Sequence, residues 1–459
     1  MRLFPSTRRD VLLKLGAAMT ASATASLAPP RAFAQGTIRK RKNIESLGSD
    51  ELSAYKHAIQ VLKDHSSDPN DPKGYAYWAA LHDLFDESIH SGCAHFSEKF
   101  FPWHRRYLYD FEVALQKSDP PATKDVMIPY WDWTTRTKTG SNYPAAFEDS
   151  ASSLFDGTRF SISQPPWDPD DILTMVREPD WSLFAGKPDP SNGFGRNPGS
   201  VEFGPHNTLH TNISRDMADP QSAVQDSIFW SFHSGIDLCW SRWQHLHVTD
   251  TRPQPFVDPE AVLWFQDRSF TVGSTAKTTD YFYEYDYDYS ADAPAVVAAT
   301  PMVVAQASIT NPPRNVIPFT AGPEKDRHMT MEPTTASSSS EVLRLAGVKY
   351  FGNRSYRLNL YLHPKTVDVA SLDADARKEY LMRTITLWKA HHEGTAEMFV
   401  RPTPAQAAHL GEGWVVTIQS EDVVREAAAP TPHTGHAETA VPALPPTSAL
   451  VKSLELQER

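Results

Sequence analysis

The sequence is poor in three features: cysteine, long apolar runs and positive charge. Only Cys93 and Cys239 occur among the 459 residues, which excludes a disulfide-rich scaffold and permits one bridge at most. Beyond the N-terminal region no apolar run approaches the roughly 18 residues that a membrane-spanning helix needs. The formal net charge of −12 argues against nucleic acid or anionic membranes as partners. A small neutral or cationic molecule suits this charge better.

The N-terminal segment has the layout of an export signal. Ser6–Leu13 reads S-T-R-R-D-V-L-L, an alanine-rich and weakly apolar run follows, and Ala32-Phe33-Ala34 supplies an A-x-A cleavage pattern. The paired arginines and the modest apolar region favour the twin-arginine route over an ordinary basic tail. We expect residues 1–34 to be a signal peptide and the mature protein to be exported, to the periplasm or outside the cell.

The region 35–290 is predicted to be mainly α-helical with long loops. Apolar residues recur at helical spacing in four segments: Leu47 to about Leu81, from Pro102 onward, 205–213 and 226–246. Residues 141–200 are rich in Pro, Asp, Ser and Gly. Loops of this length are uncommon inside a compact domain and usually shape a site.

The remainder has a different pattern. Residues 280–289 alternate aromatic and acidic side chains, as a half-buried strand would. We expect 291–340, rich in Pro and Ser, to be a linker and 426–459 to be a disordered tail. Between them, 341–425 is predicted to form a small β-sandwich-like C-terminal domain. Its strand-like runs are Tyr356–Leu362, Thr384–Trp388, Ala396–Val400 and Trp414–Ile418.

Several of the eighteen histidines stand at spacings that suit a metal site. His95 and His104 are nine residues apart, which would put them on opposite faces of one helix. Pro102 resolves this, because proline is favoured at the start of a helix and leaves His95 in the preceding segment. That segment can fold back beside His104.

A second group of histidines lies further along the chain. His206 and His210 are four residues apart and therefore share one helical face. Asp237 follows His233 by one helical turn, where a carboxylate suits the orientation of an imidazole ligand. Ligation by imidazoles alone points to copper, zinc, iron or nickel. A single histidine in isolation is more often an ordinary core or surface residue.

The residues around these histidines resemble a known family. His95–Glu112 contains H-F-S-E-K-F-F-P-W-H-R and resembles the first copper-site signature of tyrosinases, catechol oxidases and molluscan haemocyanins. Asp226–Asp237, D-S-I-F-W-S-F-H-S-G-I-D, resembles the second-site signature. It departs from the usual pattern at Ser227 and Phe232, and Leu238 replaces a frequent arginine. None of these departures removes a ligand.

Further matches follow in the family's order. Pro129–Trp133 resembles its P-Y-W-D-W element, Glu202–Asn207 its E-x-x-P-H-N element, and Tyr283-x-Tyr285 the tyrosine motif that closes its core. The resemblance covers roughly residues 40–290. It implies a four-helix-bundle core in which each of two copper ions is held by three histidines.

The resemblance also implies the ligand set. The expected ligands are His82, His95, His104, His206, His210 and His233. For the first ligand, the family places a histidine on a helix after an aromatic-Ala-Ala stretch. His82, in Y-W-A-A-L-H, fits this place, and His90 is the rival. The His391-His392 pair is expected to have no metal role.

Three further residues receive roles from the resemblance. In the family a glutamate and an asparagine hold a water near the second copper and help to deprotonate monophenols, and Glu202 and Asn207 occupy the matching positions. Glu202 could equally cap the His206 helix. Cys93-Ala94-His95 resembles the Cys-x-His element of fungal tyrosinases, whose sulfur is bonded to the ligand imidazole. A free thiol or a disulfide to Cys239 is the alternative for Cys93.

By resemblance, the expected function is a copper-dependent oxidation of monophenols or o-diphenols to o-quinones with O2. An o-aminophenol oxidase and a haemocyanin-like oxygen carrier are the alternatives, and a mononuclear zinc hydrolase would leave three histidines unexplained. The C-terminal domain is expected to cover the copper pocket until it is cleaved or displaced. Six aromatic residues could form an apolar pocket wall or ordinary core: Phe100, Phe101, Trp103, Phe229, Trp230 and Phe232.

Overall fold

The computed structural model describes most of the chain after the N-terminal segment. The described residues are 37–83, 93–135, 143–160, 169–187, 197–249, 253–265, 268–293, 315–325, 327–333, 341–389, 393–410, 413–423 and 443–458. The expected signal peptide, His90 and the His391-His392 pair lie outside these ranges. Within them, no helix combines the length and apolarity needed to cross a membrane.

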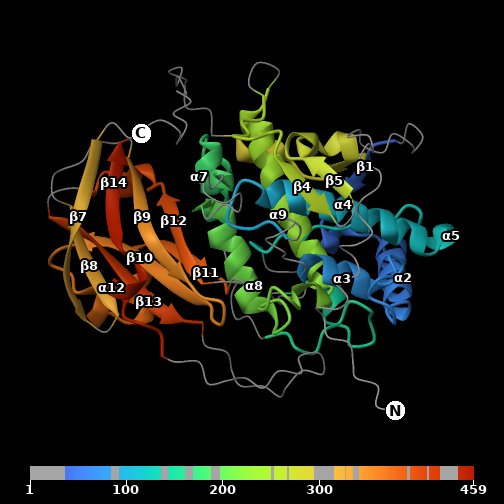
Figure 1. Cartoon of the computed structure of the whole chain (residues 1–459), viewed down its shortest axis with the longest axis horizontal. Coiled ribbons are helices and arrows are strands. Elements are labelled where there is room, and N and C mark those ends of the chain that lie inside the picture. Colours follow the sequence, from blue (N-terminus) through green and yellow to red (C-terminus); the bar gives the residue numbers. More distant parts are fainter. Residues whose placement is uncertain are drawn as a thin grey trace, which may run out of the picture. The chain divides into compact units, whose positions relative to one another are not determined.

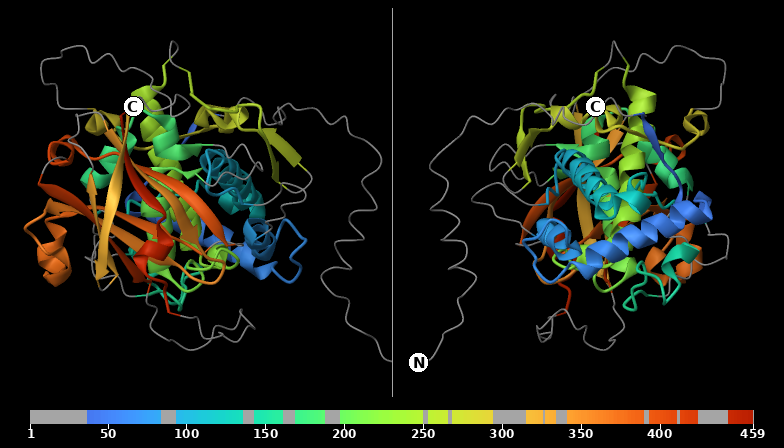
Figure 2. Two further views of the ribbon diagram at one scale, coloured as in Figure 1. Left: turned by 60° about the vertical axis from the view of Figure 1, so that its left-hand side comes forward. Right: turned by 90° about the vertical axis from the view of Figure 1, so that its right-hand side faces the viewer.

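The first part of the chain forms a helical domain. Its longest helices are α2 (Ser49–Asp64), α4 (Phe100–Ser118) and α9 (Ile228–His247). Helix α4 packs against both α2 and α9 (Figures 1 and 2). The shorter helices are α3 (Tyr75–Asp83), α5 (Pro120–Thr123), α6 (Pro169–Val176), α7 (Trp181–Ala185) and α8 (Asn207–Ile213). The predicted helical character of this region is confirmed.

Two helix boundaries differ from the sequence prediction. The helical pattern from Leu47 to Leu81 is divided into α2 and α3 by a turn that contains Pro69 and Pro72, and proline cannot continue a helix interior. Helix α4 begins at Phe100, two residues before Pro102. Proline is tolerated there because the first four N–H groups of a helix have no partner within it.

Short strands tie the helical domain together. Strand β1 (Arg39–Arg41) pairs in parallel with β6 (Tyr283–Tyr285), so the two ends of the domain meet. The strand predicted over 280–289 is limited to β6, because Phe282 adopts a left-handed φ of 59° and helical turns flank it. Two small hairpins complete the domain: β2 (Gly186–Lys187) with β3 (Asn197–Pro198), and β4 (Val262–Phe265) with β5 (Arg268–Thr271).

The C-terminal region is rich in β-sheet, as predicted. Eight antiparallel strands follow the order β11-β10-β13-β8-β7-β14-β9-β12. They are β7 (Asn315–Lys325), β8 (His328–Pro333), β9 (Glu341–Tyr350), β10 (Tyr356–Pro364), β11 (Leu381–Leu387), β12 (Gly394–Val400), β13 (Trp414–Asp422) and β14 (Ser453–Glu458). Short helices α10 (Ala374–Lys378), α11 (Pro404–Ala407) and α12 (Thr447–Leu450) connect them.

The eight strands share a single apolar core. Strand β7 pairs with β14 through its first residues and with β8 through its last, and its register shifts between Ala321 and Glu324. Because its first and last residues pair with different strands, β7 joins β14 on one side to β8 on the other. Leu358 of β10 and Leu345 of β9, on different halves, are both completely buried in the same cluster.

Two predicted boundaries of this domain are wrong. The expected linker 291–340 contains β7 and β8, and the expected disordered tail 426–459 contains α12 and β14. Strand β14 lies between β7 and β9 (Figure 1). Its sequence S-L-E-L-Q-E alternates polar and apolar residues, and both leucines are completely buried. The Pro- and Ala-rich composition of the flanking residues concealed this short alternation.

The helical and C-terminal domains each place one aromatic residue in the apolar core of the other. Trp388, which directly follows β11, packs into the main core of the helical domain. Phe203 of the helical domain packs into the core of the C-terminal sheet. A smaller cluster joins Leu183 to Val342 and Phe399. The two cores therefore meet next to the candidate histidines.

Candidate metal centre

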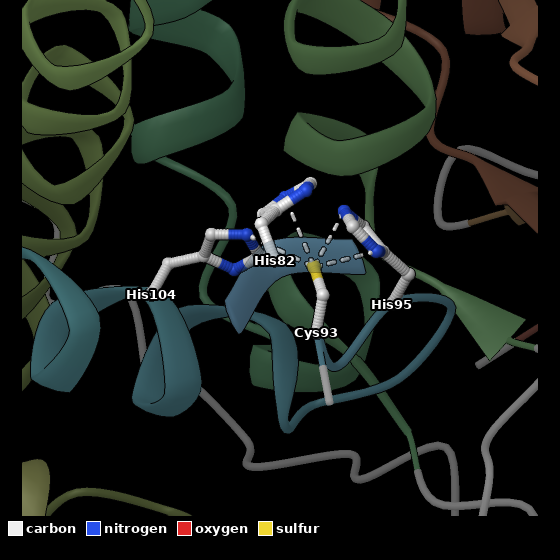
Figure 3. A group of neighbouring side chains, drawn as sticks. All are labelled: His82, Cys93, His95 and His104. Atoms are coloured by element: carbon white, nitrogen blue, oxygen red, sulfur yellow. Dashed lines mark hydrogen bonds between the residues drawn. The ribbon is translucent and has the colours of Figure 1, made fainter. Parts of the chain in front are cut away.

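The first group of candidate ligands comes from three neighbouring segments. His82 lies near the end of α3, Cys93 and His95 precede α4, and His104 lies in its second turn. Their possible ligand atoms all lie within 4.8 Å of one another. Cys93 Sγ points into the group, 3.1 Å from His82 Nε2, 3.1 Å from His95 Nδ1 and 3.5 Å from His104 Nε2 (Figure 3).

The second group contains His206, His210 and His233. His206 ends an irregular turn before α8, His210 lies on α8, and His233 lies on α9. Their possible ligand atoms also lie within 4.8 Å of one another. His210 Nε2 and His233 Nε2 are 3.2 Å apart. His206 and His210 are therefore joined by a third histidine, His233, which stands 23 residues beyond His210 in the chain.

The two groups adjoin. The rings of His104 and His233 are stacked, with centroids 4.5 Å apart and an angle of 8° between their planes. The centroids of His95 and His206 are 5.4 Å apart. The structure therefore brings all six predicted ligands into one buried region in which two ions could be neighbours.

Hydrogen bonds to Nδ1 orient four of these rings. His82 Nδ1 faces Pro220 O at 3.0 Å, and His104 Nδ1 faces Phe100 O at 2.8 Å. His210 Nδ1 faces Met217 O at 2.8 Å. A carbonyl oxygen can only accept, so each Nδ1 carries the proton and Nε2 presents its lone pair to the group.

His206 Nδ1 lies 2.9 Å from Asn207 Oδ1, which gives the same tautomer. Asn207 also reaches the C-terminal domain, because its Nδ2 donates to Thr386 O at 2.8 Å.

The protonation state of the rings also suits metal binding. Burial lowers the pKa of His104, His206, His210 and His233 well below the ordinary value, and neighbouring imidazoles lower it further. These rings are therefore neutral at physiological pH, the form that binds metals. His206 Nε2 and His233 Nδ1 are buried without a hydrogen-bond partner in the described part of the chain. Such atoms are costly unless a ligand satisfies them, and a cation at the second group would satisfy His206 Nε2.

Glu202 and Asn207 lie beside the second group, but Glu202 does not cap the His206 helix. Glu202 Oε1 accepts a hydrogen bond from Phe96 N at 2.6 Å, directly after His95 in the chain. Its Oε2 is buried without a hydrogen-bond partner among the described residues. Burial raises the pKa of Glu202 to about 8. This carboxyl group therefore keeps an oxygen available beside both histidine groups.

Asp237 has a different role from the predicted one. Its carboxylate accepts hydrogen bonds from Arg105 Nε at 2.6 Å, Tyr283 OH at 2.5 Å and Tyr285 OH at 2.8 Å. The prediction that it orients His233 is wrong, because the buried Arg105 guanidinium requires a countercharge and takes the carboxylate instead. Asp237 thus joins α9 to α4 and β6.

The predicted aromatic wall divides into two sets. Phe229 lies with its centroid 4.1 Å from that of His233, Phe232 lies 5.1 Å from His210, and Phe100 lies 4.7 Å from His104. Trp103 also contacts His104, with centroids 4.9 Å apart. Phe101 and Trp230 instead stack on Phe184 and Phe111 and belong to the core.

Sequence reasoning missed Trp388 as a site residue. Its ring stacks on His210, with centroids 4.0 Å apart and an angle of 15°. It also meets His206 and His95 edge to face, with centroids 5.7 and 5.6 Å away. The sequence showed Trp388 only as the last residue of a strand-like run. A residue of the C-terminal domain thus covers one histidine of the first group and two of the second.

These features define a helical domain with two adjacent histidine groups suited to metal, in which every ring but the half-buried His95 is buried. Comparison with known proteins agrees: residues 72–171 and 156–246 match the common central domain of tyrosinase. A tyrosinase from Hahella sp. (strain CCB-MM4) is 28% identical over 250 residues, which cover 45% of this chain and 53% of that protein. Aureusidin synthase of Antirrhinum majus is 24% identical over 409 residues, 77% of this chain and 72% of that protein.

Solved structures share the fold. Latent apple tyrosinase has a TM-score of 0.62 at 20% identity, covering 87% of this chain and 96% of that chain. A functional unit of octopus haemocyanin has a TM-score of 0.54 at 17% identity, covering 84% and 94%. Residues 72–246 are thus similar to the central domain of the tyrosinase and polyphenol oxidase family. The chain matches about half the length of the Hahella tyrosinase.

Proposed function

We propose that this protein is a di-copper oxidase that converts monophenols, o-diphenols or both to o-quinones with O2. The observation that carries the proposal is the adjacency of two buried groups of histidines, each able to hold one ion. The proposed ligands are His82, His95 and His104 for one ion and His206, His210 and His233 for the other. Imidazole donors suit copper, and the family supports that metal.

Bound copper would supply the redox chemistry toward O2, and the chain's own residues would provide binding, orientation and exclusion of water. The helices that carry the ligands, α3, α4, α8 and α9, form the family's four-helix bundle in this proposal. Phe229 and Phe232 give a phenolic ring an apolar surface beside the second group. Trp388 occupies the same surface and would have to move before a substrate ring could lie on His210.

Glu202 and Asn207 are proposed to act on monophenols. A monophenol must lose its phenolic proton before it can be hydroxylated. Oxidation of an o-diphenol needs no such hydroxylation and depends less on a nearby base. In this proposal Glu202 Oε2, which has no hydrogen-bond partner among the described residues, accepts that proton, directly or through a water held with Asn207. The positive charge of bound copper would lower the pKa of Glu202 and make the carboxylate available near neutral pH.

Glu202→Gln will therefore lower the rate on tyrosine by about a hundredfold, while the rate on a catechol changes by less than about threefold. Glutamine keeps the acceptor for Phe96 N, so the backbone contact survives. Oxygen uptake on both substrates measures the effect. The control is Glu98→Gln, a buried carboxyl whose two oxygens accept from Val257 N, Asp258 N and Trp181 Nε1, so its loss shows what a structural change does to both rates. An equal loss on tyrosine and catechol in Glu202→Gln would assign Glu202 a structural role.

Cys93 and His95 are proposed to form a thioether during copper loading. Cys93 Sγ lies 3.1 Å from Nδ1 and 3.7 Å from Nε2 of His95, so it faces the ring carbon between them. Both cysteines are free and buried, which leaves the alternative disulfide unformed. Bond formation would remove one hydrogen from sulfur and one from the ring carbon, and O2, the co-substrate of the proposed reaction, would take up both and become hydrogen peroxide.

The thioether has a distinct mass signature. After copper loading, the peptide containing Cys93 and His95 will be lighter by two hydrogens and will resist thiol alkylation under reducing conditions. The Cys239 peptide serves as the internal control, because its thiol remains alkylatable after unfolding. Complete alkylation of Cys93 would end the thioether proposal.

We also propose that the protein is exported and that it acts on a small molecule. Residues 1–34 would direct twin-arginine export of the folded protein, and its partner would be a small phenol. Replacing Arg8-Arg9 with lysines should keep the protein in the cytoplasm, as cell fractionation would show.

One experiment tests the function and its alternatives together. Copper-loaded protein is supplied separately with tyrosine, a catechol and an o-aminophenol while oxygen uptake is followed. Turnover of tyrosine or the catechol supports the proposal. Turnover of the o-aminophenol alone would reassign the substrate, and reversible oxygen binding without turnover would indicate a carrier.

A further inference from the structure

A four-residue loop connects the two histidine groups. Met217 O accepts from His210 Nδ1 at 2.8 Å, and Pro220 O accepts from His82 Nδ1 at 3.0 Å. The loop 217–220 thus fixes the ring of one candidate ligand in each group. Because an imidazole follows the carbonyl that accepts its proton, a shift of this loop would turn both rings.

The two middle residues of the loop face the C-terminal domain. Ala218 O accepts from Trp388 Nε1 at 2.9 Å. The carboxylate of Asp219 pairs with Lys389 Nζ, and the exposed fractions of these side chains are 25% and 20%. A pair shielded to this extent holds its geometry better than a surface pair, which contributes little. The two outer residues of the loop, Met217 and Pro220, therefore each contact a histidine, and the two residues between them contact the C-terminal domain.

The same segment of the C-terminal domain reaches a third ligand. Asn207 Oδ1 orients His206 at 2.9 Å, while Asn207 Nδ2 donates to Thr386 O at 2.8 Å. The Thr386 hydroxyl also lies 2.7 Å from that of Thr208, the next residue on α8. The segment Thr386–Lys389 is thus bonded to Asn207, which orients His206, and to the two loop residues that stand between the carbonyls orienting His210 and His82.

The other histidine with a fixed Nδ1 provides a contrast. His104 Nδ1 faces Phe100 O of its own helix α4, at 2.8 Å. Its ring is therefore set within the helical domain. By comparison, the carbonyls that orient His82 and His210 belong to the loop 217–220, whose Ala218 and Asp219 are bonded to Trp388 and Lys389 of the C-terminal domain.

We propose that the segment Thr386–Lys389 positions His82, His206 and His210 for metal binding by fixing the groups that orient their rings. This role goes beyond covering the pocket, and it rests on the proposed di-copper function. The C-terminal domain would then keep metal in place as well as keeping substrate out. Loss of its hydrogen bonds would loosen the metal even where the Trp388 ring still covers the site.

The test uses the full chain and two substitutions that leave the loop sequence unchanged. Trp388→Phe retains an aromatic ring over His210 and removes the donor to Ala218. Lys389→Met removes the partner of Asp219. Lys389→Arg is the conservative rescue, since arginine can still pair with that carboxylate. Lys365→Met is the matched control, because it breaks an exposed pair with Glu332 on the same domain.

Two readouts are measured. The first is the rate at which copper passes from the loaded protein to a competing chelator. We expect Trp388→Phe and Lys389→Met to release copper about tenfold faster than the unmodified chain, the lower end of what partners of metal-bound histidines contribute. Lys389→Arg and Lys365→Met should match the unmodified chain. The second is amide hydrogen exchange in residues 214–222 of the metal-free protein, which should rise only in the first two variants.

The outcomes separate this inference from the proposed function. If the unmodified chain fails to bind two copper ions, the di-copper proposal fails, while the exchange measurement still tests the support of the loop. If copper binds but all variants release it at the same rate, the positioning role is wrong. Faster release together with global unfolding in Lys365→Met as well would also overturn it, because a general loss of stability would then be the cause.

Discussion

Replacing His104 or His210 with alanine will remove about half of the bound copper and nearly all oxidase activity. Each ring is buried, neutral and held through Nδ1 with Nε2 directed into its group. Loss of the ring removes a ligand outright, and even partners behind ligands contribute about 10–100-fold in affinity. Copper content by elemental analysis and oxygen uptake on a catechol measure the two effects.

The control for this prediction is His57→Ala. His57 is an exposed histidine of the same domain that pairs with Asp119 on the surface, so its loss should leave copper content unchanged. Thermal unfolding of the metal-free variants shows whether the fold persists. Full activity in either His104→Ala or His210→Ala would exclude the ligand assignment.

The second large effect is expected from removal of the Trp388 side chain, which covers the second histidine group. Trp388→Ala will raise kcat/KM for a bulky o-diphenol by about tenfold or more, because the covered state competes with substrate and only the open fraction can bind it. The stacking of Trp388 on His210 at 4.0 Å is the contact that is lost. Initial rates of oxygen uptake with copper-saturated protein measure the change.

Trp388→Phe separates the ring from its hydrogen bond. Phenylalanine still covers His210, so substrate access should stay close to that of the unmodified chain. Cleavage within 294–314, before β7 begins, should act in the same direction as Trp388→Ala if it releases the sheet. Equal turnover of a bulky diphenol by Trp388→Ala and the unmodified chain would contradict the covering role.

Much of the candidate site followed from the sequence alone because its signals are local. The spacing of His206 and His210 predicted that their rings meet, and their centroids are 4.5 Å apart, although His206 ends the turn before α8. Pro102 correctly separated the segment of His95 from the helix of His104. Helices and strands with clear periodicity were also predicted, because apolar side chains that repeat every 3.6 or every 2 residues can be recognised within a short stretch of sequence. The family resemblance then supplied the number of ions and the identity of the metal.

The remaining features depend on residues that are distant in sequence, and the tertiary structure alone decided them. Strand β14 required partners from β7 and β9 before its six residues could be recognised as part of the sheet. Asp237 was predicted to serve His233, but a buried guanidinium from another helix took its carboxylate. Trp388 reaches Ala218 across 170 residues. No local pattern encodes such a contact, because it arises only when two separately folded cores pack together and bury the same side chain.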